Sequence, residues 1–406
     1  MTETQAFTFF GLGIDPKILK LLESLHFTIP TPIQHQSIPP GLAGKDIIGI
    51  AQTGTGKTLA FGIPMIQRLL ELPGRGLIVL PTRELAIQVN EALEKIARPM
   101  KMGSAVLIGG ESMHRQIGEL RRHPRILIAT PGRLLDHMQQ RFVSLKDIQI
   151  LVLDEADRML DMGFAPQINE ILRQAPRQRQ TLLYSATMPS AIMNIATSHM
   201  QLPVRVEVAP SGTAAEKVEQ EIIIIHKEGK LPLLKEILAE YPGKVLVFSR
   251  TKFGAQKICS QLSRSSFGVS EIHSNRSQSQ RKEAMEGFRR GRHRILVATD
   301  IAARGIDVRD IELVINFDLP DNSGDYVHRI GRTGRAGREG KAISFATPDQ
   351  KRDIRDIERL IRNPLKVTSK LPASHPDAAY ALKPLPKKSN TVRTFRSRRG
   401  PGRKRF

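Results

Sequence analysis

The stretch AQTGTGKT, residues 51–58, has the composition and the setting of a loop that holds phosphate. It follows the apolar run DIIGI and precedes a run of helical periodicity. Glycines let backbone N–H groups close around a phosphate, and the following helix presents its positive end. Lys57 would then reach the β and γ phosphates, and the Thr58 hydroxyl would bind Mg²⁺. The strict pattern begins with Gly rather than Ala51, and the alternative is a glycine-rich turn capped by Thr. The predicted binding residues of this loop are Ala51, Gln52, Thr53, Gly54, Thr55, Gly56, Lys57 and Thr58.

A second stretch, LVLDEADRML from Leu151, places acids directly after an apolar strand. Like charges this close repel one another, so either a divalent cation or the start of a helix must explain them. A phosphate loop needs a second metal ligand on a neighbouring strand, and Asp154 fits that role. Glu155 is placed to orient or deprotonate an attacking water. Asp157 and Asp161 remain either first-turn helix acids or couplers to other loops.

The glycine-rich segment GRTGRAGR, residues 331–338, offers Arg332 and Arg335 as further catalytic candidates. An arginine supplied late can neutralise charge in a phosphoryl-transfer transition state, which is worth on the order of 10³–10⁵ in rate. The alternative is a basic loop that binds nucleic acid.

These motifs lie on a regular pattern of strands and helices. Strand-length apolar blocks recur at Asp46, Gly76, Arg125, Ile150 and Thr181. Continuous Ile, Leu and Val are typical of parallel strands covered by helices on both faces. Helical segments lie between them, such as the one that starts at Arg83. The alternation predicts an α/β fold with doubly wound parallel sheets.

The second half of the chain repeats the first. RILIAT at Arg125 matches RILVAT at Arg294, and GLIVLPTR at Gly76 resembles KVLVFSRT at Lys244, at nearly the same offset. The repeat predicts two related domains, 1–207 and 217–368, joined by a linker at 208–216. The second copy of the phosphate loop would fall near residue 219, where the sequence EQEIIIIHKEGK has no glycine-rich loop. We therefore expect one nucleotide site, to which the second domain contributes from across a cleft.

Composition favours a nucleic-acid partner. Of the 406 residues, 62 are Lys or Arg and 40 are Asp or Glu, which gives a net charge of +22. Such a surplus favours a polyanion, although a basic protein without one is the alternative. Cys259 is the only cysteine, so no intrachain disulfide or cysteine-rich zinc site can form. No signal peptide and no membrane-spanning run is visible, and we expect a cytoplasmic protein without membrane contact. Residues 369–406 form a predicted disordered basic tail, either an RNA tether or a solubility tail.

Eight motifs in order make the chain similar to a known family. They are PTPIQ at Pro30, AQTGTGKT at Ala51, PTRELA at Pro81, TPGR at Thr130, DEAD at Asp154, SAT at Ser185, ATDIAARGID at Ala298 and YVHRIGRTGR at Tyr326. The chain resembles the DEAD-box ATP-dependent RNA helicases of the compact bacterial type, from about Phe9 to Leu365. The resemblance implies two tandem RecA-like domains, ATP and Mg²⁺ as cofactors, and RNA as partner.

The resemblance also implies roles for individual residues. Gln34 resembles the adenine reader and Phe27 the aromatic residue that stacks on the base, with core packing as the alternative for Phe27. Asp307 resembles the residue that meets the ribose from the second domain. Residues similar to those that couple the ATP state to strand separation are Ser185, Thr187 and His328. Residues similar to those that contact the RNA backbone are Arg83, Gly110, Thr130, Arg133, Thr299 and Arg304.

We therefore expect an RNA-stimulated ATPase that unwinds short RNA duplexes locally or remodels RNA–protein complexes. An ATP-gated RNA clamp or chaperone with little turnover is the alternative, and a DNA-directed helicase on the same scaffold is another. Ribosomal precursors and RNA-decay proteins stay open as partners. Two positions depart from the family pattern: His26 and Ser274 stand where Gly is more common.

Overall fold

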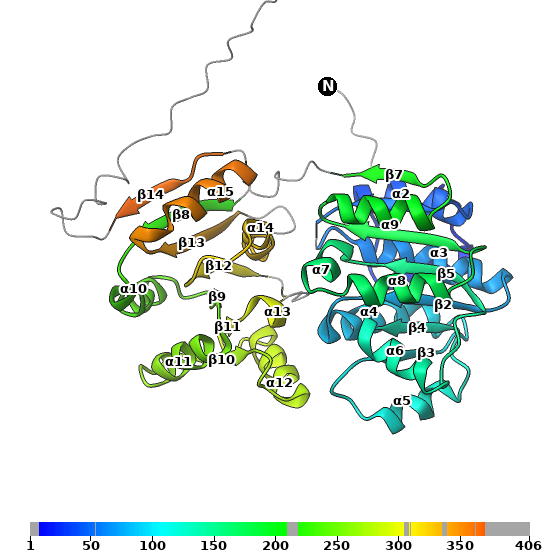
Figure 1. The fold of residues 1–406 in the computed structure, drawn as a ribbon, viewed down its shortest axis with the longest axis horizontal. Helices are drawn as coiled ribbons and strands as arrows, with labels where there is room; N and C mark the ends of the chain where they lie inside the picture. Colours follow the sequence, from blue (N-terminus) through cyan, green and yellow to red (C-terminus); the bar gives the residue numbers. More distant parts are fainter. Residues whose placement is uncertain are drawn as a thin grey trace, which may run out of the picture.

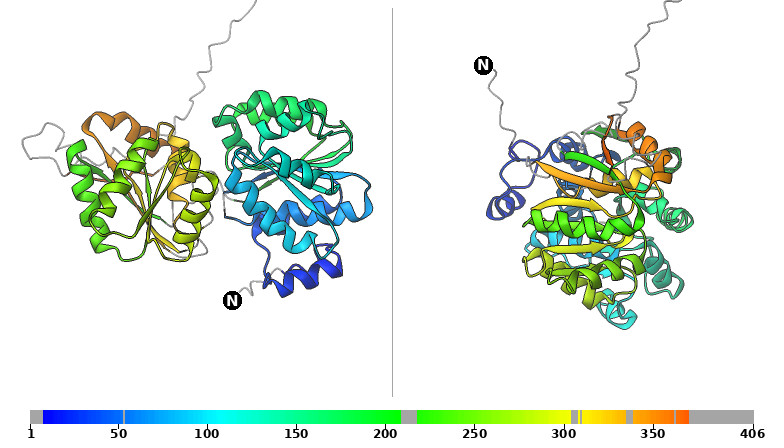
Figure 2. Two further views of the ribbon diagram at one scale, coloured as in Figure 1. Left: turned by 90° about the horizontal axis from the view of Figure 1, so that it is seen from below. Right: turned by 90° about the vertical axis from the view of Figure 1, so that its left-hand side faces the viewer.

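The computed structural model describes residues 8–52, 54–208, 218–303, 308, 310–334, 339–361 and 363–369. They form two similar halves that lie side by side, each a parallel sheet with helices on both faces (Figures 1 and 2). The predicted α/β fold with two doubly wound sheets is confirmed. Within the described part, no helix is long and apolar enough to cross a bilayer.

The first sheet contains strands in the order β3-β4-β2-β5-β6-β1-β7, and every neighbouring pair is parallel. Its strands are β1 (Ile47–Ile50), β2 (Arg75–Val79), β3 (Ser104–Leu107), β4 (Ile126–Ala129), β5 (Ile148–Leu153), β6 (Gln180–Ser185) and β7 (Val204–Glu207). Its helices are α1 (Pro16–Ser24), α2 (Pro32–Leu42), α3 (Lys57–Glu71), α4 (Arg83–Ala97), α5 (Met113–Leu120), α6 (Pro131–Gln139), α7 (Ala156–Asp161), α8 (Ala165–Gln174) and α9 (Ser190–His199). The four central strands β2, β5, β6 and β1 are buried almost throughout, as continuous apolar runs require.

The second sheet repeats this order as β10-β11-β9-β12-β13-β8-β14. Its strands are β8 (Val218–Ile224), β9 (Lys244–Phe248), β10 (Val269–Ile272), β11 (Ile295–Ala298), β12 (Ile311–Asn316), β13 (Gly340–Ala346) and β14 (Lys366–Ser369). Its helices are α10 (Lys227–Glu240), α11 (Lys252–Ser263), α12 (Gln278–Arg289), α13 (Asp300–Ala303), α14 (Ser323–Ile330) and α15 (Lys351–Ile361), with a 3₁₀ turn at Pro348–Gln350.

The internal repeat corresponds to equivalent strands. RILIAT lies on β4 and RILVAT on β11, both next to the outermost strand, while the second pair lies on β2 and β9. The equivalent of β1 is β8, and α10 begins only three residues after it, at Lys227. The short connection leaves no room for a second phosphate loop, as the sequence predicted.

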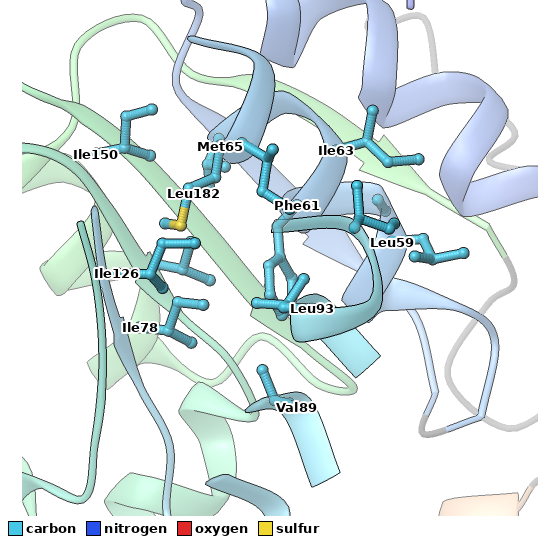
Figure 3. Close-up of a cluster of buried hydrophobic side chains, with 14 of the residues drawn as sticks. Leu59, Phe61, Ile63, Met65, Ile78, Val89, Leu93, Ile126, Ile150 and Leu182 are labelled. Carbon is cyan, nitrogen blue, oxygen red and sulfur yellow. The ribbon is translucent and has the colours of Figure 1, made fainter. Parts of the chain in front are cut away.

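Apolar side chains fill both faces of each sheet. Figure 3 shows one such cluster, in which Phe61 and Met65 of α3 pack toward Ile78, Ile126 and Leu182 of the sheet. This packing fixes α3 against the sheet, and with it the orientation of the loop before α3.

The domain boundaries stay a prediction. β7 ends at Glu207 and β8 begins at Val218, and the predicted linker 208–216 lies outside the described residues apart from Val208. The predicted tail 369–406 also lies outside them, apart from Ser369.

Candidate nucleotide and nucleic-acid site

The phosphate-loop candidate lies where β1 ends and α3 begins. Gly54 and Gly56 have φ values of 87° and 93°, a region that residues with a side chain rarely adopt. A Cβ atom on Gly56 would collide with the Gln34 amide. The Thr55 hydroxyl donates to the Gln52 carbonyl at 2.7 Å, and the Ala51 N–H donates to the Ser185 carbonyl at 3.0 Å. The loop therefore has the tight turns that phosphate binding needs; Thr53 lies outside the described residues.

Gln34 connects this loop to α2. It is 4% exposed, its Nε2 donates to the Gly56 carbonyl at 3.0 Å, and its Oε1 accepts from the Thr31 N–H at 2.9 Å. Phe27 is 40% exposed, so core packing does not account for it. The residue before it, His26, has a φ of 61°. This left-handed conformation is a physical reason for Gly to be common there.

Lys57 and Asp154 face each other in the interior of the first half. Their Nζ and Oδ1 atoms are 3.6 Å apart, and the side chains are 5% and 4% exposed. Lys57 Nζ has no hydrogen-bond partner among the described residues. Burial raises the pKa of Asp154, the Lys57 charge opposes that rise, and the Glu155 charge adds to it. A buried ammonium without a hydrogen bond can donate to an anionic oxygen at little further desolvation cost.

Glu155 is held in an unusual conformation. Its φ is 52° and its ψ is 48°, in the left-handed region, directly before α7. Its N–H donates to Asp154 Oδ1 at 2.9 Å, and its Oε2 lies 2.8 Å from Arg158 Nη1. The side chains of Glu155 and Arg158 are 3% and 1% exposed. Sequence reasoning did not single out Arg158, although an Arg three residues after an acid at a helix start is a visible i,i+3 pair.

Asp157 couples two loops. Its Oδ2 accepts from both the N–H and the hydroxyl of Thr187, each at 2.8 Å, and its own N–H donates to Ser185 Oγ at 3.2 Å. The sequence left Asp157 either a first-turn helix acid or a coupler; it is an acid in the first turn of α7 and it also contacts the loop after β6. Ser185 and Thr187 thus lie against the acids that follow β5.

In the second half, Arg332 is buried at 3% exposure and its Nε donates to the His328 carbonyl at 3.2 Å. Arg329, which the sequence did not single out, makes a two-pronged ion pair with Asp300 at 2.5 and 2.7 Å. Its guanidinium also lies 5.0 Å from the centroid of the Phe248 ring. Arg329 thereby ties α14 to the start of α13. The predicted positions Arg335, Asp307 and Arg304 lie outside the described residues.

The RNA candidates of the first half gather where β2, β3 and β4 end. Arg83 is the first residue of α4, and a Cβ atom on Gly110 would collide with its guanidinium. Thr130 caps α6, and Arg133 Nη1 donates to the Glu111 carbonyl at 3.0 Å. Thr299 follows β11 in the second half. In Figure 1, strands β2, β4 and β3 occupy the same lower end as β9, β11 and β10, so both sets of candidates lie toward one end of the molecule.

Known proteins place this geometry in a family. Residues 31–195 match the family model of the DEAD/DEAH box helicases, and residues 229–337 match that of the helicase conserved C-terminal domain. The ATP-dependent RNA helicase CshA of Listeria monocytogenes is 41% identical over 353 residues, which are 86% of this chain and 68% of the relative. The chain belongs to the DEAD/DEAH box helicase family. The predicted family resemblance is thereby confirmed.

Solved structures add information on the arrangement of this helicase's two halves. Mss116p bound to single-stranded RNA and AMP-PNP is 28% identical, covers 94% of this chain and 83% of its own, and gives a TM-score of 0.84. A DEAD box protein from Methanococcus jannaschii is more similar in sequence, at 37% identity over 90% of this chain and 99% of its own. Its TM-score is nevertheless only 0.53. A value near one half is expected when only one of two equal halves superposes. The halves of this helicase are therefore arranged as in the complex with RNA and AMP-PNP.

Among the described residues, an ion pair joins the halves in this arrangement. Arg281 Nη2 of α12 lies 2.8 Å from Glu84 Oε1 of α4, with side-chain exposures of 10% and 9%. Burial raises the pKa of Glu84, and the Arg281 charge opposes that rise. The pair borders a cavity of about 500 Å³ between α4, α5 and α12. This pair could not be predicted from the sequence, because its members are far apart in the chain and lie on different domains.

Proposed function

We propose that the described site binds ATP and Mg²⁺ and couples hydrolysis to local unwinding of short RNA duplexes or to RNA–protein remodelling. By family the chain is an ATP-dependent RNA helicase, an enzyme that hydrolyses ATP in the presence of RNA. The observation that carries the proposal is the buried cluster of Lys57, Asp154 and Glu155 behind the phosphate loop, joined through Asp157 to Thr187. Such a cluster would connect the bound nucleotide to the loop after β6, which contains Thr187.

ATP would be held by residues of three kinds. Gln34 would read the adenine edge and Phe27 would stack on its face, since one is an amide beside the loop and the other an exposed ring. The loop residues Ala51 to Gly56 would surround the phosphates with N–H groups, and Lys57 would contact the β and γ phosphates. From the second half Asp307 would meet the ribose.

The residues present suit Mg²⁺. A hydroxyl from Thr58 and a carboxylate from Asp154 are hard oxygen ligands, and Mg²⁺ is commonly bound by one or two such groups together with substrate phosphates and water. When bound, Mg²⁺ would neutralise charge on the phosphate oxygens. The buried Asp154 carboxylate lies beside Lys57 and Glu155. Mg²⁺ bound to Asp154 would therefore lie close to both of these side chains.

Glu155 would orient the attacking water and accept its proton. The Arg158 ion pair and the Asp154 hydrogen bond hold its carboxylate in one position, so it need not reorganise when the substrate arrives. Arg158 acts through Glu155 and is a positioning residue. Arg332 and Arg335 of the second half would stabilise charge on the γ-phosphate, and their place on the opposite half makes hydrolysis depend on closure.

RNA would be held by its backbone across both halves. Arginines beside small residues, such as Arg83 at Gly110 and Arg133 at Thr130, can follow phosphates and 2′-hydroxyls without reading bases. Thr299 and Arg304 would continue this surface on the second half. Ser185, Thr187 and His328 would transmit the ATP state to it. Together these contacts make RNA binding and domain closure one event.

The binding partners and the cellular location of this helicase can be proposed only in general terms. RNA is the proposed partner, and ribosomal precursors fit a surface that follows the RNA backbone. RNA-decay proteins are a separate proposal for protein partners. We propose a cytoplasmic location, because a single cysteine, Cys259, allows no intrachain disulfide, as is usual in a reducing compartment.

The experiment compares a short RNA duplex with the same duplex in DNA. With ATP the wild type should separate the RNA duplex, and with AMP-PNP it should bind without repeated turnover. The alternative, a clamp with little turnover, predicts RNA retention with ATP and no separation. Equal separation of the DNA duplex would make the chain a helicase without RNA preference.

A further inference from the structure

The second half exposes an aromatic side chain that its own fold does not use. Phe253, in the first turn of α11, is 67% exposed. The buried residues of α11 are Ala255, Ile258 and Leu262. At 100° per residue these three form one stripe, and Phe253 projects to the opposite side of the helix. Packing of α11 on the sheet therefore does not explain a phenylalanine at this position.

Phe253 follows β9, the strand beside the one that leads to Thr299. β9 and β11 are parallel neighbours, with Phe248 opposite Ala298, so the segments that follow them begin side by side. The Ser249 N–H donates to the Ala298 carbonyl at 2.9 Å, one residue before Thr299. Phe253 is four positions after Ser249, in the first turn of α11. This turn therefore follows the same carboxyl end of the sheet as Thr299.

The residues that accompany Phe253 on the exposed side of α11 are basic or polar. Lys252 Nζ lies 5.3 Å from the centroid of the ring, and the first turn of α11 contains no acid. On the exposed side of α11 the next residues, Gln256 and Lys257, are exposed and polar. A protein partner is usually recognised by a contiguous apolar patch, whereas a single ring among cations suits a nucleobase beside its phosphates.

We propose that Phe253 stacks on a base of the bound RNA strand at the second-half end of the RNA surface. This inference rests on the proposed function and adds a base contact to it, since none of the other RNA candidates is aromatic. Stacking needs only the face of a base, so the contact would tighten binding without selecting a sequence. Lys252, which touches the ring, would meet the phosphate of the same nucleotide.

The test combines a protein change with an RNA change. Binding of a short single-stranded RNA is measured with AMP-PNP, and one base at a time is removed along the strand. The wild type should lose about 5- to 150-fold in affinity at one or two adjacent positions. Phe253→Ala should bind intact RNA more weakly by the same factor and should lose nothing further at those positions. Phe253→Trp should behave as wild type, and Phe253→Leu, which keeps apolar bulk without a π face, as Ala.

A matched control is Phe142→Ala, because Phe142 is an exposed ring of the first half near the amino ends of the strands. It should leave the abasic profile unchanged. The inference is overturned if Phe253→Ala binds intact RNA as wild type does or keeps the same sensitivity to base removal. The ATPase rate of the wild type, measured in parallel, separates failure of the proposed function from failure of the stacking. If RNA does not stimulate the wild-type ATPase, the proposed function is refuted. If RNA stimulates it but removal of no base lowers the affinity, only the stacking is refuted.

Discussion

Replacing Arg158 with methionine should slow hydrolysis without weakening ATP binding. The substitution keeps an unbranched apolar stem but removes the guanidinium that lies 2.8 Å from Glu155 Oε2. Both side chains are at most 3% exposed, so water cannot take the place of the lost charge. A catalytic carboxylate released from its position costs on the order of 10² in rate, and we expect that loss in kcat with KM for ATP nearly unchanged. Breaking a buried pair also lowers the free energy of unfolding by about 3–5 kcal/mol.

The assay is steady-state ATP hydrolysis at saturating RNA, on four chains that form a double-mutant cycle. They are the wild type, Arg158→Met, Glu155→Gln and the double variant. Because Arg158 is inferred to act only through Glu155, adding Arg158→Met to Glu155→Gln should not lower kcat further. Arg158→Lys keeps a charge and should recover part of the rate, while urea unfolding reports the fold. If the two losses in kcat multiply in the double variant, Arg158 does not position Glu155.

Further predictions concern other contacts of the site. Gln34→Ala removes the amide beside the phosphate loop and should reduce the preference for ATP over GTP about tenfold, measured as the ratio of kcat/KM values. Asp157→Asn weakens both Thr187 contacts and should lower the number of duplexes separated per ATP consumed by about tenfold. The control, Asp161→Asn at the exposed end of α7, should leave this number unchanged. Glu84→Arg should raise the RNA concentration for half-maximal ATPase, and adding Arg281→Glu should return that concentration to the wild-type value. Glu91→Gln, exposed in the same cavity, is the control. If the reversed pair does not return the concentration to the wild-type value, the contact does not support closure. Removing residues 383–406 should weaken RNA binding and flatten its salt dependence by about 0.7 per lost phosphate contact; equal affinity at low salt would make them a solubility tail.

Much of the scaffold could be predicted from the sequence, because its determinants are local. The run ILVLD is buried on both faces and forms β5, and the repeated RILIAT and RILVAT motifs lie on equivalent strands. The glycines of AQTGTGKT have the positive φ values that make the motif recognisable. In each case the residue type follows from a conformational or burial requirement at that position.

The contacts that organise the site depend on tertiary structure and could not be predicted in the same way. Asp157 is an acid in the first turn of α7, but its second contact, with Thr187, exists only because β5 and β6 are neighbours. The Glu84–Arg281 pair joins two domains, and neither helix shows a charge pattern that names the partner. Arg158 was visible as an i,i+3 pair, but its burial beside Glu155 was not.

In the proposed mechanism hydrolysis requires RNA, because the two halves complete the site only when a strand bridges them. The most direct test is the rate of ATP hydrolysis at saturating ATP as single-stranded RNA is titrated from zero. We expect a low basal rate that rises with RNA to a plateau, with matched DNA producing little effect. A rate without RNA that already equals the plateau would mean that the first half hydrolyses ATP unaided, in contradiction of this mechanism.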